Sequence, residues 1–380
     1  MSIEQYREEI DNIDKELVEL FKKRMEVSGK VAAYKQQVGK PVMDPSRERQ
    51  LLERVSDLAG EEYESQTRLL YHTILGLSRS RQNRLLGTPG DLVEEIKTAI
   101  SETSPLFPER AIVACQGVEG AYSQQACEKL FTAPSIMFLN TFEGVFHAVD
   151  KGLCRYGILP LENSTAGSVN QIYDLMLKSR FHIVRSTRIH VSHMLLGKAG
   201  VRLEDVRDIY SHEQALQQGS EFLQTLPNVT VPVCENTAMA AKAVAESDRT
   251  DVAAISSGAC AALYGLKVVQ TAIANEDNNY TRFICISKKP EIYPGAHRTS
   301  LMMVVPHKPG SLYHVMSKFY SLGINLNKLE SRPIAGKDFE FMFYFDIDVP
   351  VYSENFFSLI SQLQTECEEF RYLGSYTEVV

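Results

Sequence analysis

The spacing of apolar residues changes near residue 111 of this chain, and that change restricts the folds it can adopt. Up to about residue 85, apolar residues recur every three to four positions, which is the period of an amphipathic helix. From Ala111 onward, short apolar runs alternate with helical stretches, which is typical of an α/β fold. A chain of 380 residues can form two or three domains. The sequence therefore predicts an all-helical amino-terminal domain followed by α/β structure.

The apolar stripe of the first helix is interrupted by positive charge. Arg24 lies on the stripe between Leu20 and Val27, and Lys35 follows about three helical turns later on nearly the same face. Unpaired charge is costly to bury, and no carboxylate of this helix lies between the two cations on that face. We therefore expect a bound anion, such as a small acidic metabolite. The alternative is that both cations are solvated and extend from the edge of the stripe. The stripe comprises Ile10, Ile13, Leu17, Leu20, Val27, Val31, Tyr34 and Val38.

Arg7 extends this reasoning to a second chain. It precedes Arg24 by about seventeen residues, which in a continuous helix is roughly 25 Å along the axis with a turn of about 100°. One small ligand cannot contact both side chains within one chain. If Arg7 serves a site of this kind, it serves the site of a partner chain, which predicts an intertwined dimer.

Two breaks divide the helical region into three helices. The segment 39–41 (Gly-Lys-Pro) ends the first helix, and Asp44 followed by Pro45 is typical of a helix start with Asp44 as its N-cap. A third helix is expected from about residue 63 to residue 86. Residues 87–90 (Gly-Thr-Pro-Gly) are typical of a linker.

Composition and missing motifs exclude several classes of function. A net charge of −8 disfavours general attraction to nucleic acid or anionic lipid. The amino terminus lacks the apolar core of a signal peptide, and no apolar run approaches the roughly 20 residues that span a bilayer. The seven cysteines form no CxxC pair, so we expect reduced thiols, a cytoplasmic protein and no metal site. The sequence contains no phosphate-binding glycine loop, so no motif indicates a nucleotide cofactor.

Two stretches depart from the simple α/β alternation. Residues 179–197 are long and rich in strand-forming residues, and we expect them to cross between two lobes. After a polar linker at 288–300, the expected order is strand, helix, strand, strand, helix, strand. That order is typical of a split ferredoxin-like sandwich.

Four short motifs lie at the ends of predicted strands. The segment 117–123 (GVEGAYS) joins a strand to a helix whose free N–H groups can bind anions. The others are 162–164 (ENS), 281–283 (TRF) and 330–333 (ESRP). In this order, and with the cations of the helical region, the chain resembles the bifunctional chorismate mutase–prephenate dehydratases, the P-proteins of phenylalanine biosynthesis. The resemblance spans essentially the whole chain.

The resemblance implies three domains. Residues 1–88 would form an all-α, three-helix chorismate mutase that is an intertwined dimer. Residues 109–288 would form a prephenate dehydratase of two α/β lobes, similar to periplasmic binding proteins, and residues 299–377 a ferredoxin-like ACT regulatory domain. The implied protein is a cytoplasmic homodimer or higher oligomer. It would convert chorismate into prephenate and prephenate into phenylpyruvate, with feedback inhibition by phenylalanine and with no cofactor, metal, nucleic-acid or membrane partner.

The mutase reaction is a pericyclic rearrangement of a dicarboxylate, so it needs positioning and charge stabilisation rather than a nucleophile. The resemblance implies that Arg24 and the partner's Arg7 bind the carboxylates, and that Lys35 and Gln82 donate hydrogen bonds to the breaking ether. The acidic members of the set would take the hydroxyl. The implied mutase residues are Arg7, Arg24, Lys35, Asp44, Arg47, Glu48, Ser78 and Gln82.

Prephenate loses water and carbon dioxide together, and aromatisation drives the reaction. By resemblance, Thr281 protonates or hydrogen-bonds the departing oxygen, while Arg282 binds a carboxylate or bridges the lobes. A threonine at a strand start is also ordinary β structure, and Glu162 could be an acid or part of a bridging ion pair. The implied substrate-binding residues are Ser123, Asn163, Ser164, Thr165, Ser211, Gln218 and Arg282.

The carboxy-terminal motifs imply an allosteric site. Phenylalanine would bind near Gly310, Ser311 and Leu312, and residues 330–332 would couple its binding to the dehydratase. The coupling residues are Glu330, Ser331 and Arg332. Three alternatives remain at this stage: a purely architectural carboxy-terminal sandwich, a helical region that is only a dimerisation stalk, and a non-catalytic sensor, because fold alone does not define function.

Overall fold

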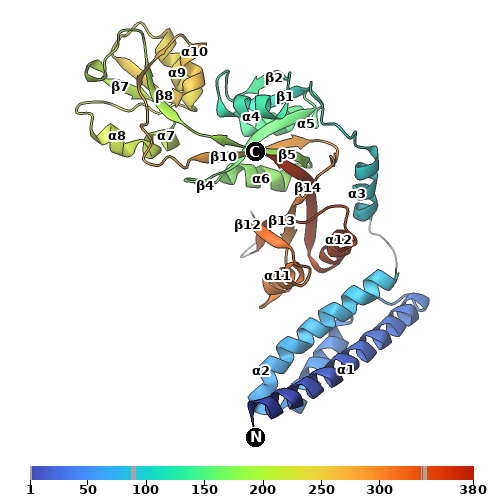
Figure 1. Ribbon diagram of the computed structural model, residues 1–380. Helices are drawn as coiled ribbons and strands as arrows, with labels where there is room; N and C mark the ends of the chain where they lie inside the picture. Colours follow the sequence, from blue (N-terminus) through green and yellow to red (C-terminus); the bar gives the residue numbers. More distant parts are fainter. Residues whose placement is uncertain (1, 87–90, 335, 337–339) are drawn as a thin grey trace. The chain divides into compact units, whose positions relative to one another are not determined.

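The computed structural model describes residues 2–86, 91–334, 336 and 340–380 (Figure 1). The linker predicted at 87–90 lies outside the described residues. The chain divides into two compact units. The first consists of Met1–Glu95, Pro306–Gly323 and Glu354–Cys367, and the second of Ile96–Val305, Ile324–Ser353 and Glu368–Val380.

Helices form the first unit, as the apolar period predicts. Helix α1 spans Ile3–Gln37 and α2 spans Pro45–Leu86. Gly60 interrupts α2 with φ 69° and ψ 170°, so the third predicted helix is the part of α2 that follows this residue. Asp44 caps α2, because its Oδ1 accepts a hydrogen bond from the backbone N–H of Arg47 at 3.0 Å. The unit also contains α11 (Ser311–Ser321) and α12 (Glu354–Glu366).

The face of α1 that packs within the chain is not the predicted stripe. The buried residues of α1 are Met25, Ser28 and Ala32. On the stripe, Leu17 and Leu20 are 55% and 61% exposed, and Ile10 and Ile13 are exposed to a similar degree. The apolar period of the stripe is therefore real, but the two segments of α2 leave that side of α1 uncovered.

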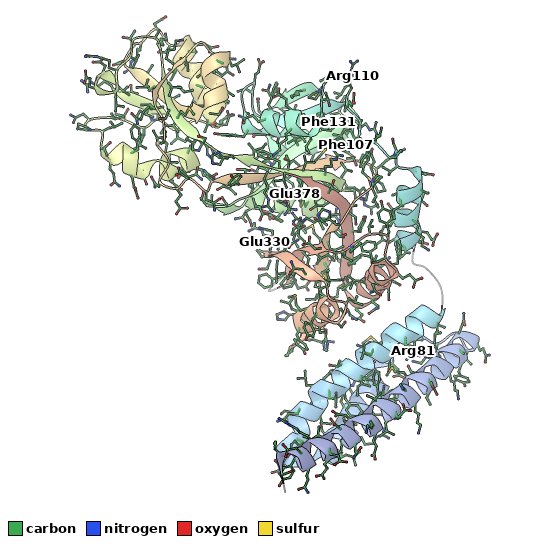
Figure 2. The ribbon with its side chains drawn as sticks, viewed as in Figure 1. Arg81, Phe107, Arg110, Phe131, Glu330 and Glu378 are labelled. Carbon is green, nitrogen blue, oxygen red and sulfur yellow. The ribbon has the colours of Figure 1, made fainter. Side chains whose placement is uncertain are left out.

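The first lobe of the second unit is a mixed sheet with helices. Its strand order is β5-β10-β3-β1-β2, with β1 parallel to β2 and β3 and with β10 antiparallel to β3 and β5. Phe107 packs on Phe131 in its core with ring centroids 4.9 Å apart (Figure 2). Helix α3 (Asp91–Glu102) precedes the lobe. Its elements are β1 (Ile112–Gln116), α4 (Tyr122–Leu130), β2 (Ser135–Leu139), α5 (Phe142–Asp150), β3 (Tyr156–Asn163), β4 (Gly167–Ser168), α6 (Asn170–Lys178), β5 (His182–His190) and β10 (Tyr280–Ser287).

The second lobe is a four-stranded sheet of order β7-β8-β6-β9. The chain enters it where β5 gives way to β6 and returns through β10, so the segment 179–197 crosses between lobes as predicted (Figure 1). Its elements are β6 (His193–Gly197), η1 (Leu203–Asp205), β7 (Asp208–Tyr210), α7 (Glu213–Gln218), α8 (Ser220–Gln224), α9 (Thr237–Glu246), β8 (Val252–Ser257), α10 (Gly258–Leu263) and β9 (Lys267–Gln270).

The carboxy-terminal elements follow the predicted order βαββαβ. Their strands pair antiparallel in the order β12-β13-β11-β14. Strand β14 also pairs in parallel with β5, Thr377 opposite Arg185, so these strands continue the first lobe as one ten-stranded sheet. Gly374 permits this approach: its φ is 140°, and a Cβ there would lie 2.2 Å from the carbonyl oxygen of Ile183. The strands are β11 (Arg298–Val304), β12 (Asn325–Pro333), β13 (Phe341–Asp348) and β14 (Glu369–Val379).

Two candidate active sites

The first unit holds a cavity of about 360 Å³ between α1 and α2. Seven of the eight residues that the resemblance implied for a mutase line this cavity, and Arg7 does not. The sequence argument missed Ser28, Arg54 and Arg79 of the same lining, although each lies within a few residues of an implied one. The seven are Arg24, Lys35, Asp44, Arg47, Glu48, Ser78 and Gln82.

Two cations of this cavity, Arg24 and Lys35, have no carboxylate partner among the described residues. Arg24 donates to Ser78 Oγ at 2.7 Å, and Lys35 donates to the carbonyl of Val42. No carboxylate of the described residues forms an ion pair with Arg24 or Lys35. Burial lowers the pKa of the Arg24 guanidinium, and the nearby Tyr71 opposes this only in part. The cavity therefore favours an anionic ligand.

Two implied polar residues already have partners in the chain. Glu48 binds Arg79 at 2.6 Å and 2.8 Å, so its charge is compensated. Gln82 is 7% exposed and donates from Nε2 to Ser28 Oγ at 3.1 Å. Its Oε1 is buried and has no hydrogen-bond partner among the described residues.

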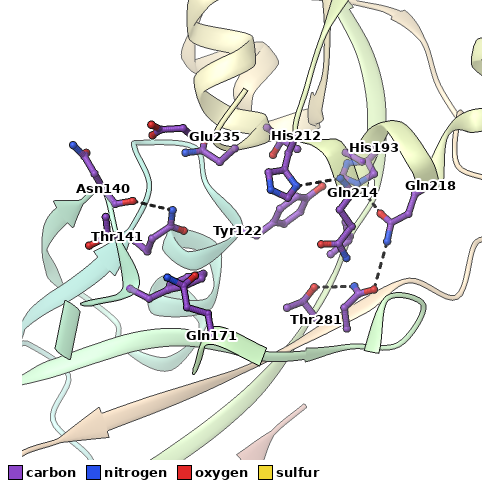
Figure 3. A pocket seen from close by; sticks show the side chains of 17 residues that line it. Tyr122, Asn140, Thr141, Gln171, His193, His212, Gln214, Gln218, Glu235 and Thr281 are labelled. Atoms are coloured by element: carbon purple, nitrogen blue, oxygen red, sulfur yellow. Dashed lines mark hydrogen bonds between the residues drawn. The ribbon is translucent and has the colours of Figure 1, made fainter. Parts of the chain in front are cut away.

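The second unit holds a cavity of about 480 Å³ between its two lobes (Figure 3). Among the residues implied for a dehydratase, Asn163, Gln218 and Thr281 line it. Asn163 and Thr281 lie opposite each other on β3 and β10, and Asn163 Nδ2 donates to Thr281 Oγ1 at 3.0 Å. Gln218 reaches from α7 of the other lobe and donates to Thr165 Oγ1 at 2.8 Å. Hydrogen bonds among these side chains therefore connect the lobes.

Three implied hydroxyls hold the backbone and are absent from the lining of this cavity. Ser123 donates to the carbonyl of Gln116 at 2.6 Å, and the fully buried Ser211 donates to that of Ile255 at 2.7 Å. Ser164 donates to the carbonyl of Asn278 at 2.8 Å. The structure thus does not bring these three together with Thr281 for binding substrate.

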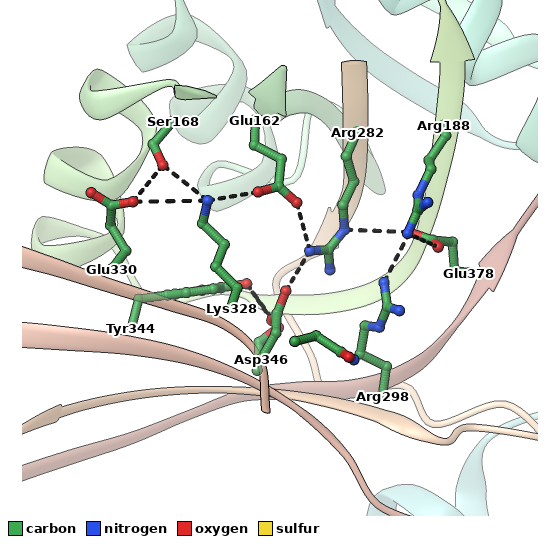
Figure 4. Close-up of polar contacts among 12 residues, drawn as sticks. Glu162, Ser168, Arg188, Arg282, Arg298, Lys328, Glu330, Tyr344, Asp346 and Glu378 are labelled. Atoms are coloured by element: carbon green, nitrogen blue, oxygen red, sulfur yellow. Dashed lines mark hydrogen bonds and ion pairs between the residues drawn. The ribbon is translucent and has the colours of Figure 1, made fainter. Parts of the chain in front are cut away.

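Arg282 differs more strongly from its expected role. It follows Thr281 on β10, so its side chain points to the opposite face of the sheet. There its guanidinium contacts Asp346 and lies 3.2 Å from Glu162 and 2.7 Å from the Tyr376 hydroxyl (Figure 4). Arg282 therefore links β10 to the carboxy-terminal strands; it neither lines the cleft nor bridges the two lobes.

Glu162 is held as a carboxylate on the same face. Lys328 lies 2.6 Å from its Oε2 and Arg282 lies 3.2 Å from its Oε1. Although burial favours the neutral acid, these two cations keep the pKa of Glu162 below its usual range. Glu162 is thus an ion-pair residue between β3 and β12 and is poorly suited to donate a proton.

The cleft receives several helix N-termini. Helices α4, α5 and α9 begin at its wall, with Tyr122, Thr141 and Asn236 among the lining residues. The lining contains no lysine or arginine. Free N–H groups and helix dipoles favour anions. Carboxylates can therefore be bound here without a cationic side chain.

Sequence reasoning missed most of this lining. Tyr122 lies inside the GVEGAYS motif and His212 adjoins Ser211 in the sequence, but neither was assigned to the site. His193 also lines the cavity, and no motif surrounds it. The other residues missed come from separate loops that share no motif: Gln116, Asn140, Thr141, Phe142, Gln171, Val191, Gln214, Ala215, Glu235, Asn236 and Thr237.

The implied allosteric residues fall in both units. Gly310, with φ 85°, precedes α11 in the first unit, together with Ser311 and Leu312. Glu330 and Arg332 lie on β12 in the second unit, with Ser331 between them. Arg332 binds both carboxylate oxygens of Asp174 on α6 at 2.9 and 3.0 Å, and Glu330 accepts from Ser168.

Among the described residues, no group of three or more histidine, cysteine, aspartate or glutamate side chains is placed to hold a metal ion. No helix in the described part of the chain is both long and apolar enough to cross a membrane.

A helical unit with a cationic cavity and a two-lobed α/β unit with a polar cleft define a multidomain enzyme that acts on small anionic molecules. Comparison with known proteins identifies the family of this enzyme. The chorismate mutase type II family matches residues 6–83, and the prephenate dehydratase family matches residues 113–291. The chain belongs to the bifunctional chorismate mutase/prephenate dehydratase family, an enzyme family of phenylalanine biosynthesis.

Individual relatives agree with this assignment. The bifunctional chorismate mutase/prephenate dehydratase of Escherichia coli K12 is 30% identical over 97% of this chain and 95% of its own length. Arogenate dehydratase/prephenate dehydratase 2 of Arabidopsis thaliana is 34% identical over 80% of this chain and 87% of its own. The prephenate dehydratase of Arthrobacter aurescens, solved in complex with L-Phe, superposes with a TM-score of 0.64 at 26% identity, covering 70% of this chain and 89% of that one.

Proposed function

We propose that the cavity of the first unit rearranges chorismate into prephenate, and that the cleft of the second unit converts prephenate into phenylpyruvate. The observation that supports the first step is that Arg24 and Lys35 line the cavity and have no carboxylate partner among the described residues. Arg24 binds a substrate carboxylate. Lys35 and the amide of Gln82 stabilise the negative charge that develops on the breaking ether oxygen.

The mutase site is completed by a second copy of the chain. The apolar stripe of α1 supports this, because its first half is more than 50% exposed in one chain, and contiguous exposed apolar surface indicates an interface. Arg7 lies on that half of α1, away from the cavity of its own chain. The partner's Arg7 supplies the second carboxylate contact in an intertwined dimer.

In the second step, Thr281 assists departure of the hydroxyl. Its Oγ1 accepts a hydrogen bond from Asn163, so its own proton can be donated to the leaving oxygen. The bond to the ring carboxylate breaks, its electron pair enters the ring, and the hydroxyl leaves as water with the proton of Thr281. Thr281 then recovers one proton from solvent. The aromatic product, phenylpyruvate, and carbon dioxide leave the cleft.

Helix N-termini hold the substrate carboxylates in this cleft. The absence of lysine and arginine from the lining supports this, since a dianionic substrate must still be compensated. The N-termini of α4, α5 and α9 provide N–H groups from both lobes. The amide of Gln218 completes the polar wall and donates to the hydroxyl of Thr165, which is outside the lining.

The carboxy-terminal elements act as a phenylalanine-binding ACT domain. Their βαββαβ order and antiparallel strand order support this. Phenylalanine binds near Gly310, Ser311 and Leu312. Glu330 and Arg332 then act as couplers rather than as ligand contacts, because their side chains are bound to Ser168 and Asp174 of the dehydratase.

One experiment tests the two activities together. The full-length chain, given chorismate, should form phenylpyruvate, detected by its ultraviolet absorbance in alkali; a non-catalytic sensor would form none. Thr281→Val should keep the mutase rate and reduce dehydration by about two to four orders of magnitude, the usual contribution of a positioned proton donor. Thr281→Ser, which keeps the hydroxyl, is the matched control. Equal loss of both activities in Thr281→Val would contradict the assignment of Thr281.

A further inference from the structure

The polar side chains of the dehydratase cleft form a directional chain of hydrogen bonds, and its direction can be fixed without choosing any amide orientation. Asn163 Oδ1 accepts from the backbone N–H of Thr165 at 3.1 Å and of Ala166 at 2.9 Å. A backbone N–H can only donate, so this end of the amide must be the oxygen. Nδ2 of Asn163 therefore faces Asn279 Oδ1 at 2.7 Å and Thr281 Oγ1 at 3.0 Å.

The same logic orients Gln218. Asn279 Oδ1 accepts from Asn163, so the other end of the Asn279 amide is Nδ2. This Nδ2 donates to Gln218 Oε1 at 3.0 Å. Gln218 Nε2 then donates to Thr165 Oγ1 at 2.8 Å, and that hydroxyl donates onward to Asn163 Oδ1 at 2.8 Å. The oxygen of Gln218 is thus an acceptor on the side that faces His193.

His193 completes the chain from the second lobe. Its Nε2 lies 3.1 Å from Gln218 Oε1, so Nε2 must carry a hydrogen. Its Nδ1 is buried and has no hydrogen-bond partner among the described residues. The imidazole is 5% exposed, and burial lowers the pKa of His193 to about 4. At neutral pH the ring is therefore neutral with its hydrogen on Nε2.

We propose that His193 is a positioning residue of the dehydratase: its Nε2–H fixes the amide of Gln218 and, through it, the hydrogen bonds that direct the Thr281 hydroxyl into the cleft (Figure 3). Each donor in the series polarises the next. Thr281 Oγ1 accepts at the end of the series, and no described group accepts its proton. The other tautomer would place a lone pair against Gln218 Oε1, which Asn279 Nδ2 holds on that side. This inference rests on the dehydratase function proposed above.

Two substitutions separate donation from packing. A glutamine at this position keeps an N–H near the place of Nε2, whereas a leucine keeps bulk and removes the donor. In the full-length chain, His193→Leu should lower the dehydratase kcat about ten-fold, the net value of one hydrogen bond, with KM changed less than about three-fold. His193→Gln should keep at least half of the wild-type kcat. The mutase rate of the same chain is the internal control and should not change.

A double substitution tests whether His193 acts through Gln218. The His193→Leu/Gln218→Leu chain should be no slower in dehydration than Gln218→Leu alone. Additive losses, a wild-type rate in His193→Leu, or a His193→Gln chain as slow as His193→Leu would each overturn the proposal. A wild-type chain without dehydratase activity would instead overturn the proposed function, so the two failures are distinguishable.

The tautomer of His193 can be measured directly by NMR, without an activity assay. In a long-range ¹H–¹⁵N NMR spectrum of chain labelled with ¹⁵N-histidine, the His193 signal is identified by its loss in His193→Gln. It should show a protonated Nε2 and an unprotonated Nδ1 at pH 7. A proton on Nδ1 alone overturns the proposal, even if His193→Leu fails to fold and loses both activities.

Discussion

Replacing Asp346 by Asn should destabilise the second unit by about 3 kcal/mol. Asp346 is fully buried on β13 and accepts from Arg282 and from the hydroxyls of Ser300, Tyr344 and Tyr376. Breaking a buried ion pair costs roughly 3–5 kcal/mol, because one charge is left buried without compensation. We expect the lower end, since the amide oxygen of Asn can still accept from the guanidinium.

The charge balance around this residue explains the size of the effect. Four cations and five carboxylates meet in one network, and Asp346 is the fully buried carboxylate among them, so its removal leaves the charge of the buried Arg282 guanidinium less compensated (Figure 4). Glu162 and Glu378 remain 3.2 Å and 3.5 Å from Arg282 and reduce this loss. The network consists of Glu162, Arg188, Arg282, Arg298, Lys328, Glu330, Asp346, Asp348 and Glu378.

The assay uses the two activities as reporters of the two units. Each variant is incubated in increasing urea, and the midpoints for loss of mutase and of dehydratase activity are compared, because a multidomain chain need not unfold in one transition. Asp346→Asn should lower the dehydratase midpoint and leave the mutase midpoint unchanged. Asp348→Asn is the matched control on the same strand: its side chain is 38% exposed and pairs with Arg298 at 3.6 Å, so it should cost less than about 1 kcal/mol. Equal shifts for the two variants would refute the argument from buried charge.

Three further predictions address the mutase, the dimer and the response to pH. Gln82→Glu should make mutase activity fall as pH rises through the pKa of the new carboxyl, because only its protonated form donates to the ether oxygen; an unchanged pH–rate profile would count against Gln82 as the donor. Leu17→Glu, on the exposed half of α1, should yield monomers by light scattering and lower the mutase rate while dehydration of added prephenate continues; a dimer of normal activity would contradict the interface. Burial lowers the pKa of His193 to about 4 in the folded chain, against roughly 6.5 in the unfolded chain. The free energy of unfolding should therefore fall by about 2 kcal/mol from pH 7 to pH 5, because the unfolded chain takes up a proton on His193 over that interval. His193→Gln should lose less stability than the wild type over that interval in urea denaturation, and equal losses would contradict the burial argument.

The helical unit shows how far an apolar period predicts structure. The period correctly gave three helices, and the Asp44-Pro45 pair correctly gave the capping role of Asp44. It did not predict which side of α1 packs within the chain, since a stripe such as that through Leu17 and Leu20 has the same spacing whether its partner is α2 or another chain. Charge on the stripe was the more informative signal, because it pointed to a ligand and therefore to the cavity that contains Arg24 and Lys35.

In the dehydratase, motif membership predicted location better than role. The serines of the motifs lie near the cleft, but Ser123 and Ser164 bond to backbone carbonyls, and a hydroxyl in a sequence does not reveal which acceptor it will find. His193 was missed for the opposite reason, because no local pattern separates a packed histidine from one that meets Gln218 across a fold. The parallel pairing of β14 with β5 joins residues nearly two hundred positions apart and has no local signature.

The geometry of β3 and β10 relates regulation to catalysis. The two strands pair with Thr281 opposite Asn163 and with Arg282 opposite Glu162. Because successive side chains of a strand point to opposite faces, the first pair meets the cleft and the second meets the charges of β12 and β13. Lys328 of β12 lies 2.6 Å from Glu162, so a shift of β12 would act on the strand that holds Asn163.

Lys328→Met should therefore weaken phenylalanine inhibition more than it weakens catalysis. Coupling between sites requires that the effector favour one of two arrangements of the protein, and a contact that differs between them carries part of the coupling free energy. Losing such a contact should raise the phenylalanine concentration for half inhibition about five-fold or more, with the uninhibited dehydratase rate within about three-fold of wild type. Lys288→Met, which removes an exposed pair with Asp150 in the same unit, should leave inhibition unchanged. If both variants were inhibited like the wild type, the ion pairs behind β3 and β10 would be structural only, and the effector signal would have to reach the cleft by another route, such as the β14–β5 pairing.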